Sequence, residues 1–175
     1  MGFTNALRRL LVRTVDPQAA SLYSSCVTAA RQPKFYAELG VPDSLDGRFD
    51  LLLLFALLTM MRMKDAKAKQ RLFDLMFADM ERSLREMGVG DMSIGKKMKP
   101  MLAGFYGRAG AYEQALAEST DDKLIAALSR NLYGLKSGTA DDAPTVASYI
   151  RLAVAKLAEQ SDAELDAGRI VFPSP

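Results

Sequence analysis

The sequence predicts an all-α fold, a single compact domain of about seven to nine helices around a buried central helix near residues 44–63. Three observations support this prediction. Residues 51–58 are apolar without a break, and residues 72–87 repeat apolar side chains with the period of a helix. No segment alternates between apolar and polar residues for long enough to form a strand. At 175 residues, the chain is long enough to build one domain with a sizeable core.

The central helix is predicted from its start signal and its apolar run. Asp43 is suited to cap the helix by accepting from free backbone N–H groups, and residues 44–46 would form the first turn. The run 49–61 is 13 residues long and is interrupted by Asp50. A membrane span needs roughly 20 apolar residues, so we expect a core helix that is buried on every side. Gly47 lies inside this helix, where close approach by a neighbouring backbone would explain it.

The N-terminal residues 3–13 form a short amphipathic and basic stretch. Its apolar side chains share one helical face, and its three arginines lie mostly off that face. The favoured interpretation is a segment that docks on its own domain, and the alternative is a peripheral segment on a membrane surface. The apolar residues are interrupted by arginines, so no signal peptide is expected.

The other helices are predicted from local signals. Asp16 with Pro17 opens one helix, Pro33 starts another, and residues 62–71 form a connection or a helix start. The clearest periodicity belongs to Phe73, Met76, Phe77, Met80, Leu84 and Met87, and Gly88 then ends that helix.

A second stripe covers residues 98–109, with Pro100 expected at a first turn or a kink, and a separate helix is expected after Gly110. Ser119 and Asp122 resemble a capping box for the helix 124–133. The last long helix is predicted to begin at residues 142–144 and to run to about residue 160.

Composition excludes several classes of chemistry. Histidine is absent and Cys26 is the single cysteine, which removes most metal-ligand clusters, histidine-based triads and cysteine–histidine nucleophiles. One cysteine forms no internal disulfide, in agreement with a reducing compartment. Residues 90–97 satisfy G-x-x-x-x-G-K, but Lys97 stands where a phosphate-binding loop needs Ser or Thr, and a helix precedes the string. We therefore expect no enzyme, no cofactor, no metal site and no catalytic residues.

Charge and methionine both concentrate in the middle of the chain. Residues 62–108 carry eleven basic and six acidic side chains, a net charge of +5, which suggests a basic face for anionic lipid, RNA or an acidic protein. Nine of the ten methionines lie between Met60 and Met101. Methionine fills irregular cores and also lines adaptable binding surfaces. The regular stripes favour the core, so the binding candidates are apolar residues off the stripes or at their ends: Met61, Met63, Leu75 and Met92.

Several blocks of sequence resemble one family. The string FYAELGVPDSLDGRFDLLLL (35–54) is similar to the signature of the ubiquinol–cytochrome c chaperone family. Further agreement comes from LREMGVGDMSIGKKMK (84–99), FYGRAGAYEQAL (105–116) and LSRNLYG (128–134), so the resemblance spans residues 35–134 in order. Phe55 stands where the family often has histidine, and a histidine contact to haem is accordingly not expected.

The resemblance implies a helical chaperone domain over residues 1–175 that assists assembly of ubiquinol–cytochrome c reductase by binding newly synthesised cytochrome b. The alternative is a membrane-surface interaction module with a basic face. The basic middle third is a candidate contact for the ribosome or the inner-membrane surface. Its lysines lack the interleaved aromatic residues of a single-strand reader, so no specific DNA binding is expected. The expected location is cytoplasmic, with peripheral contact at the inner membrane left open.

The resemblance also points to polar and turn residues of the family type: Asp43, Gly47, Arg48, Asp91, Tyr106, Arg108 and Asn131. The predicted contacts to a client or partner combine these with the apolar and basic candidates: Asp43, Arg48, Asp50, Met61, Met63, Leu75, Asp91, Met92, Lys96, Lys97, Tyr106 and Arg108. Arg48 either contacts the client or balances buried carboxylates, and the second interpretation is favoured because aspartates lie on both sides of it in the sequence. Losing one partner of a buried charge pair costs several kcal/mol.

Deletion of residues 1–13 tests the interpretation of the N-terminal segment. We expect the thermal midpoint to stay nearly unchanged, because the predicted core begins after this stretch. Thermal unfolding of the shortened chain beside the full chain measures this. A collapse of the midpoint would place the segment in the core and remove the reason for assigning it to a membrane surface.

Overall fold

The computed structural model describes residues 16–136 and 138–175, so the prediction for residues 3–13 lies outside the described part. The described residues form eight α-helices and no strand, which confirms the all-α prediction. The helices are α2 (Pro17–Ala30), α3 (Pro33–Ala37), α4 (Leu45–Arg62), α5 (Ala66–Glu86), α6 (Asp91–Ala117), α7 (Asp122–Asn131), α8 (Ala143–Glu159) and α9 (Asp162–Asp166). None of these described helices has the length and apolar character that crossing a bilayer requires.

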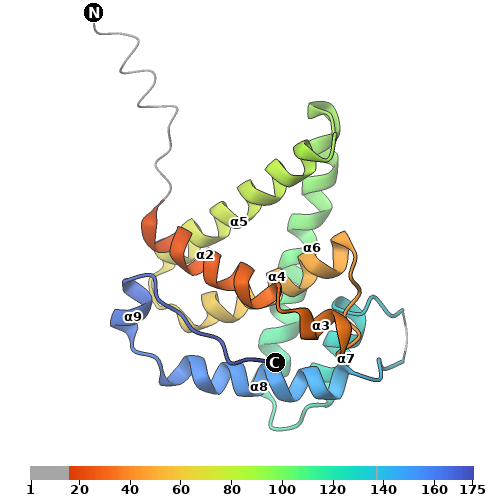
Figure 1. The fold of residues 1–175 in the computed structure, drawn as a ribbon, viewed down its shortest axis with the longest axis vertical. Helices are drawn as coiled ribbons and strands as arrows, with labels where there is room; N and C mark the ends of the chain where they lie inside the picture. Colours follow the sequence, from red (N-terminus) through yellow and green to blue (C-terminus); the bar gives the residue numbers. More distant parts are fainter. Residues whose placement is uncertain (1–15, 137) are drawn as a thin grey trace, which may run out of the picture.

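Helix α4 is the centre of the fold, as the sequence predicts. All residues from Leu51 to Met60 are buried except Leu52, which is half-buried. Helix α2 crosses α4, and α5 and α8 also pack against it (Figure 1). The one hydroxyl within the run, that of Thr59, donates to the Phe55 carbonyl at 2.9 Å and lies 3.2 Å from the Cys26 sulfur. The core therefore buries this polar group with its partners in place.

An aromatic cluster joins α4 to three other segments. Phe55 lies edge-on to Phe35 of α3 at 5.8 Å between ring centroids, and to Phe172 of the C-terminal tail at 4.8 Å. Tyr149 of α8 completes the cluster, and its hydroxyl donates to the Pro173 carbonyl at 2.8 Å. These contacts hold the C-terminal tail, which runs back across α8 toward α3 (Figure 1).

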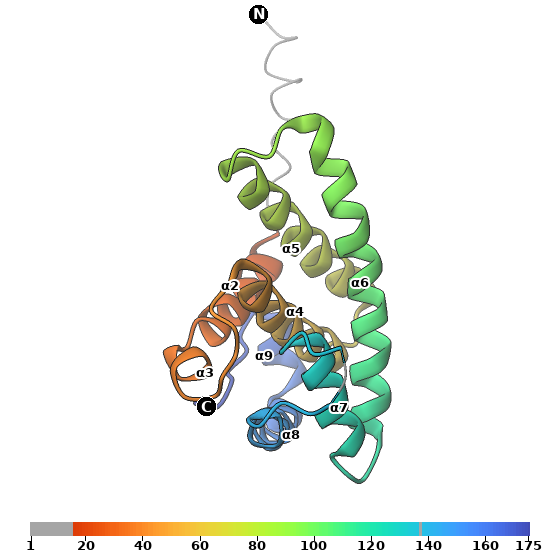
Figure 2. The same cartoon turned by 90° about the vertical axis from the view of Figure 1, so that its right-hand side faces the viewer.

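Helices α5 and α6 form a hairpin that projects beyond the rest of the molecule (Figures 1 and 2). Gly88 ends α5 with a φ of 85°, as expected from the sequence. Helix α6 is one continuous helix of 27 residues with Pro100 inside it. The prediction of a separate helix after Gly110 is therefore wrong, and so is the prediction that Pro100 lies in a first turn. Pro100 and Lys96, whose carbonyl loses its helical partner, are both exposed. Water can therefore replace the missing hydrogen bond.

Two arginines fasten the ends of helices. Arg151 donates to the carbonyls of Leu116 and Glu118, each at 2.9 Å, at the end of α6. It also pairs with Asp121 at 2.8 Å, and Asp121 occupies the N-cap position of α7. The capping box predicted from Ser119 and Asp122 is therefore wrong, because no side chain caps α7. Arg62 similarly donates to the Leu157 carbonyl near the end of α8 at 2.9 Å, a favourable place for a cation.

At the start of α4, the predicted capping residue is wrong and the predicted close contact at Gly47 is confirmed. Ser44, not Asp43, caps the helix, since its hydroxyl accepts from the Gly47 N–H at 3.1 Å. A Cβ on Gly47 would lie 2.1 Å from the Pro42 carbonyl oxygen. This contact confirms the predicted close approach of a neighbouring backbone.

We expect Gly47→Ala to destabilise the protein, because its methyl group would overlap backbone atoms that cannot turn aside. Overpacking of this kind costs about 1–3 kcal/mol in the free energy of unfolding, measured by urea denaturation. Gly107→Ala is the control. No neighbouring atom lies within 4 Å of a Cβ at Gly107. Removing that glycine from the interior of α6 should stabilise the protein by about 0.5–1 kcal/mol. Equal effects at both positions would contradict this account.

Candidate functional site

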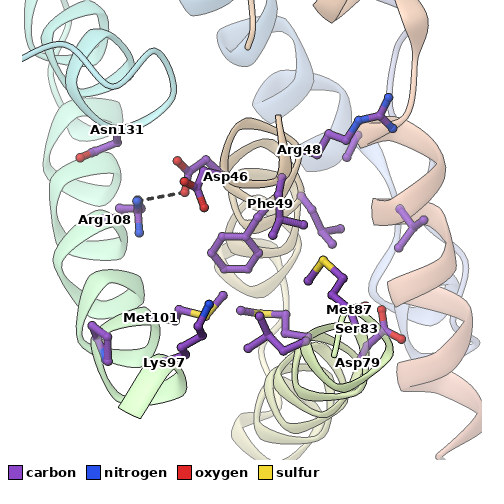
Figure 3. A pocket seen from close by; sticks show the side chains of 18 of the residues that line it. Asp46, Arg48, Phe49, Asp79, Ser83, Met87, Lys97, Met101, Arg108 and Asn131 are labelled. Atoms are coloured by element: carbon purple, nitrogen blue, oxygen red, sulfur yellow. Dashed lines mark ion pairs between the residues drawn. The ribbon is translucent and has the colours of Figure 1, made fainter. Parts of the chain in front are cut away.

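An open groove of about 860 Å³ lies between α2, the first half of α4, α5 and α6, and we call it the hairpin groove (Figure 3). This volume falls in the upper part of the roughly 300–1,000 Å³ range of ligand pockets. Its apolar lining includes residues from all four helices: Tyr23, Val27, Phe49, Leu52, Met80, Leu84, Met87 and Met101.

The groove follows from the unequal lengths of the helices. At 1.5 Å per residue, α6 is about 40 Å long and α4 about 27 Å. The outer half of the hairpin therefore extends past the helices that cover its inner half (Figure 2). Before the fully buried run of α4 begins at Leu51, the exposed Leu45 and half-buried Phe49 face this open space.

The walls of the groove combine fixed and adaptable apolar groups. Met80 and Leu84 are buried, whereas 52% of Met87 is exposed to solvent. Phe49 stands in the middle, with Met101 on the α6 side and Met87 on the α5 side (Figure 3). Methionine has three rotatable bonds and a polarizable sulfur, so these walls can repack around apolar surfaces of different shape.

An ion pair between α4 and α6 forms the polar part of the groove. A guanidinium nitrogen of Arg108 lies 3.0 Å from a carboxylate oxygen of Asp50, whose side chain is only 13% exposed (Figure 3). Burial raises the pKa of Asp50 from its usual 3.8 to about 6, Arg108 opposes this rise, and the nearby Asp46 adds to it. The Nε of Arg108 is buried without a hydrogen-bond partner among the described residues.

A second polar contact closes the opposite wall. The Tyr23 hydroxyl of α2 donates to Asp79 of α5 at 2.8 Å, and Asp79 also pairs with Arg82. Burial, followed by the contact with Asp79, raises the pKa of Tyr23, so the phenol keeps its proton and remains a donor. This hydrogen bond fixes α2 against α5 at one edge of the groove.

Five of the predicted contact residues line the hairpin groove: Arg48, Asp50, Lys96, Lys97 and Arg108. Asp43 borders it through a 2.5 Å contact with Arg48. The side chains of Arg48 and Asp43 are 54% and 55% exposed, so the prediction that Arg48 balances buried carboxylates is wrong. An exposed pair of this kind contributes about 0–1 kcal/mol. Arg48 also lies over the Tyr36 ring, 5.2 Å from its centroid.

The other predicted residues do not line the groove: Met61, Met63, Leu75, Asp91, Met92 and Tyr106. Met63 is buried in the core and Leu75 packs partly against it. Asp91 pairs with Arg85 at the hairpin tip, where Met92 is 94% exposed. Tyr106 is exposed on α6 and packs against the rings of Phe73 and Phe105. A role for these side chains in binding stays a prediction.

Sequence reasoning missed the methionine walls of the groove. Met80, Met87 and Met101 belong to the regular stripes, and a regular stripe was the reason for assigning residues to the core. One available signal was the width of the apolar surface on α5. It includes both Leu72–Met76–Met80 and Phe73–Phe77, which is more than one narrow face.

Comparisons with known proteins agree on one family. A family model described as ubiquinol–cytochrome c chaperone matches residues 37–172. The ubiquinol–cytochrome c reductase complex assembly factor 1 of Mus musculus is 27% identical over 156 residues, which cover 86% of this chain and 52% of the relative. The protein of that name from Xenopus laevis is 25% identical, covering 86% of this chain and 77% of the relative. This chain thus spans about half the length of the mouse relative.

A solved structure shares the fold. The crystal structure of the Cbp3 homolog from Brucella abortus matches with a TM-score of 0.80 and 35% identity, covering 98% of this chain and 97% of that one. Within the described residues, no group of three or more His, Cys, Asp or Glu side chains is placed to hold a metal ion.

Asp50→Asn should weaken the pH dependence of stability. Folding raises the Asp50 pKa to about 6, so between about pH 4 and pH 6 the folded protein holds a proton that the unfolded chain has released. The free energy of unfolding therefore falls as pH rises through this window. The variant should reduce that fall by about 1–2 kcal/mol, less than the full linkage value because water screens the groove.

Urea unfolding at a series of pH values measures this effect. The attraction to Arg108 exists only while Asp50 is ionised and is already contained in the Asp50 pKa, so the comparison rests on the slope of stability against pH and not on its value at one pH. Asp141→Asn, in an exposed loop, is the control and should leave the pH profile as it is. A variant at Asp50 with the profile of the unaltered protein would show that this carboxylate ionises as it does in water.

Proposed function

Because the chain belongs to the ubiquinol–cytochrome c chaperone family, we propose that it is a non-enzymatic assembly factor for ubiquinol–cytochrome c reductase whose client is newly made cytochrome b. The relatives named as assembly factors for this complex support the assembly role. Cytochrome b is a membrane protein, so a protein that holds it before insertion must cover apolar helix surface.

The hairpin groove is the surface that fits this task, and its methionine walls carry the proposal. Met87, at the end of α5, and Met101 of α6 offer apolar contact from facing sides with Phe49 between them (Figure 3), and Met80 of α5 also lines the groove. Membrane helices vary in their side chains, and flexible methionines bind several shapes better than a rigid pocket does. In this proposal the Asp50–Arg108 pair sets the position of α4 against α6 and does not itself carry out chemistry.

A second surface suits a role at the membrane. Met92 is 94% exposed at the projecting hairpin tip, and the exposed Lys99 follows it on α6, beside Lys96 and Lys97, which line the groove. An exposed apolar side chain beside several cations is typical of contact with an anionic membrane surface. We propose a cytoplasmic protein whose hairpin tip touches the inner membrane while the groove holds the client. The ribosome is the alternative anionic partner for this tip.

Two matched substitutions test the groove. Met87→Gln changes an exposed side chain that lines the groove, and Met92→Gln changes one at the tip that does not. Both should alter the free energy of unfolding by no more than about 0.5 kcal/mol. We expect Met87→Gln alone to reduce crosslinking to cytochrome b in cells that synthesise it.

Three other outcomes are informative. Reduced crosslinking for Met92→Gln alone would move the client site to the tip. Unchanged crosslinking in both variants would remove the groove as the client site. Absence of any cytochrome b crosslink to the unaltered protein would contradict the proposed client.

A further inference from the structure

We infer that the hairpin groove binds one face of an apolar helix whose flanking polar positions carry carboxylates. This inference rests on the proposed function and adds the chemistry of the segment that is held. It combines the shape of the groove with the signs of the charges that line it.

The shape selects one face of a helix. A helix with its side chains is about 10–12 Å across, and 860 Å³ holds the side chains of one face but not a whole helix. The groove is partly open to solvent, and apolar side chains of α4, α5 and α6 line it. Such a groove takes the anchoring side chains of an amphipathic helix at positions i, i+3, i+4 and i+7.

The charges that line the groove favour a helix whose flanking residues are negatively charged. Six cationic side chains line the groove against three carboxylates, Asp46, Asp50 and Asp79, an excess of three positive charges. The cations are Arg31, Arg48, Lys96, Lys97, Arg108 and Arg130.

Most of this excess is uncompensated within the protein. Arg48 and Arg108 are paired with Asp43 and Asp50. The other four cations, Arg31, Lys96, Lys97 and Arg130, form no ion pair within residues 16–136 and 138–175.

Lys97 and the residue that follows Arg130 mark two different ends of the apolar lining (Figure 3). Lys97 lies toward the hairpin tip, and Asn131, which follows Arg130 in α7, lies at the opposite end (Figure 3). A helix lying between them would meet positive charge beyond each end of its buried face. Carboxylates at those positions gain attraction and faster association, whereas lysines or arginines there are repelled.

The same argument predicts weaker binding in the groove by a peptide of the chain's own N-terminal residues than by an acidic helix. Residues 3–13 are apolar enough to enter the groove, but their charged groups are Arg8, Arg9 and Arg13. The segment itself carries no carboxylate, and the three carboxylates of the groove are outnumbered by its six cations.

Two synthetic helical peptides test the inference. They share one leucine-rich face and differ only in flanking residues, which are glutamate in one and lysine in the other. Fluorescence anisotropy with the full chain gives each Kd. At about 0.05 M salt we expect the acidic peptide to bind at least about tenfold more tightly, and the preference to shrink near 0.5 M salt as charges are screened.

Charge reversal on α6 supplies the matched variants. Lys96→Glu with Lys97→Glu changes two lysines that line the groove, whereas Lys99→Glu changes an exposed lysine on the same helix that does not line it. In the double variant, the ratio of the two Kd values should fall by about tenfold or more. The Lys99 variant should keep the ratio of the unaltered protein. Melting curves of all three proteins verify that they are folded.

Four results would overturn the inference. These are equal affinity for the two peptides, a preference insensitive to salt, an equal effect of the Lys99 variant, and displacement of the acidic peptide by a peptide of residues 1–15. If the peptides show no preference but Met87→Gln still loses cytochrome b crosslinking, the charge inference fails and the proposed function stands. If the acidic preference is present but no cytochrome b is crosslinked, the groove property stands and the client proposal fails.

Discussion

The burial of helix α4 is the constraint on which the rest of the fold depends. A helix that is apolar on all sides from Leu51 onward needs neighbours on every side, and α2, α5 and α8 supply them. The ring of Phe55 extends this requirement to α3 and to the C-terminal tail through edge-on aromatic contacts. Segments from both ends of the described chain are thus held by one helix. The first turns of α4, before Leu51, carry Asp46, Phe49 and Asp50 and are free of that constraint, so a groove can open there without exposing the core.

The Asp50–Arg108 pair sets the polar boundary of this groove. Removing two charges from water costs several kcal/mol, and their attraction repays that cost only with good geometry. Here the Asp50 side chain is 13% exposed, the Arg108 side chain is 25% exposed, and the Nε of Arg108 has no hydrogen-bond partner among the described residues. The pair is therefore a weak source of stability. Its main effect is to fix the position of α6 against α4. Moving the two helices apart would leave both buried charges unpaired, which is unfavourable.

Local patterns in the sequence predicted the helices well where one signal dominated. The apolar run gave α4, and Asp16, Pro33 and Gly88 marked helix ends that the structure contains. Prediction failed where two local signals competed: Ser44 and Asp43 are both good caps, and Pro100 and Gly110 are helix breakers that a long exposed helix tolerates. It also failed where the answer lies far away in the chain. Asp50 lies beside Arg48 in sequence, but its partner is Arg108 on another helix, which spacing alone does not reveal. Likewise, the stripe on α5 indicates an apolar face but not where the covering helices stop.

The apolar walls and the cationic ends of the groove contribute differently to client binding. Methionine contacts are individually weak and indifferent to sequence, so affinity from the walls grows with the apolar area covered and is similar for many helices. The cations add little affinity per exposed pair, but they act at longer range and oppose segments of the wrong sign. A chaperone with these two features selects clients by their charge during association. Once the client is bound, the affinity comes from the apolar surface area that is buried. Neither contribution demands a deep and rigid fit. The client can therefore leave when a larger apolar surface, such as its partner subunits or the bilayer, competes for the same helix face.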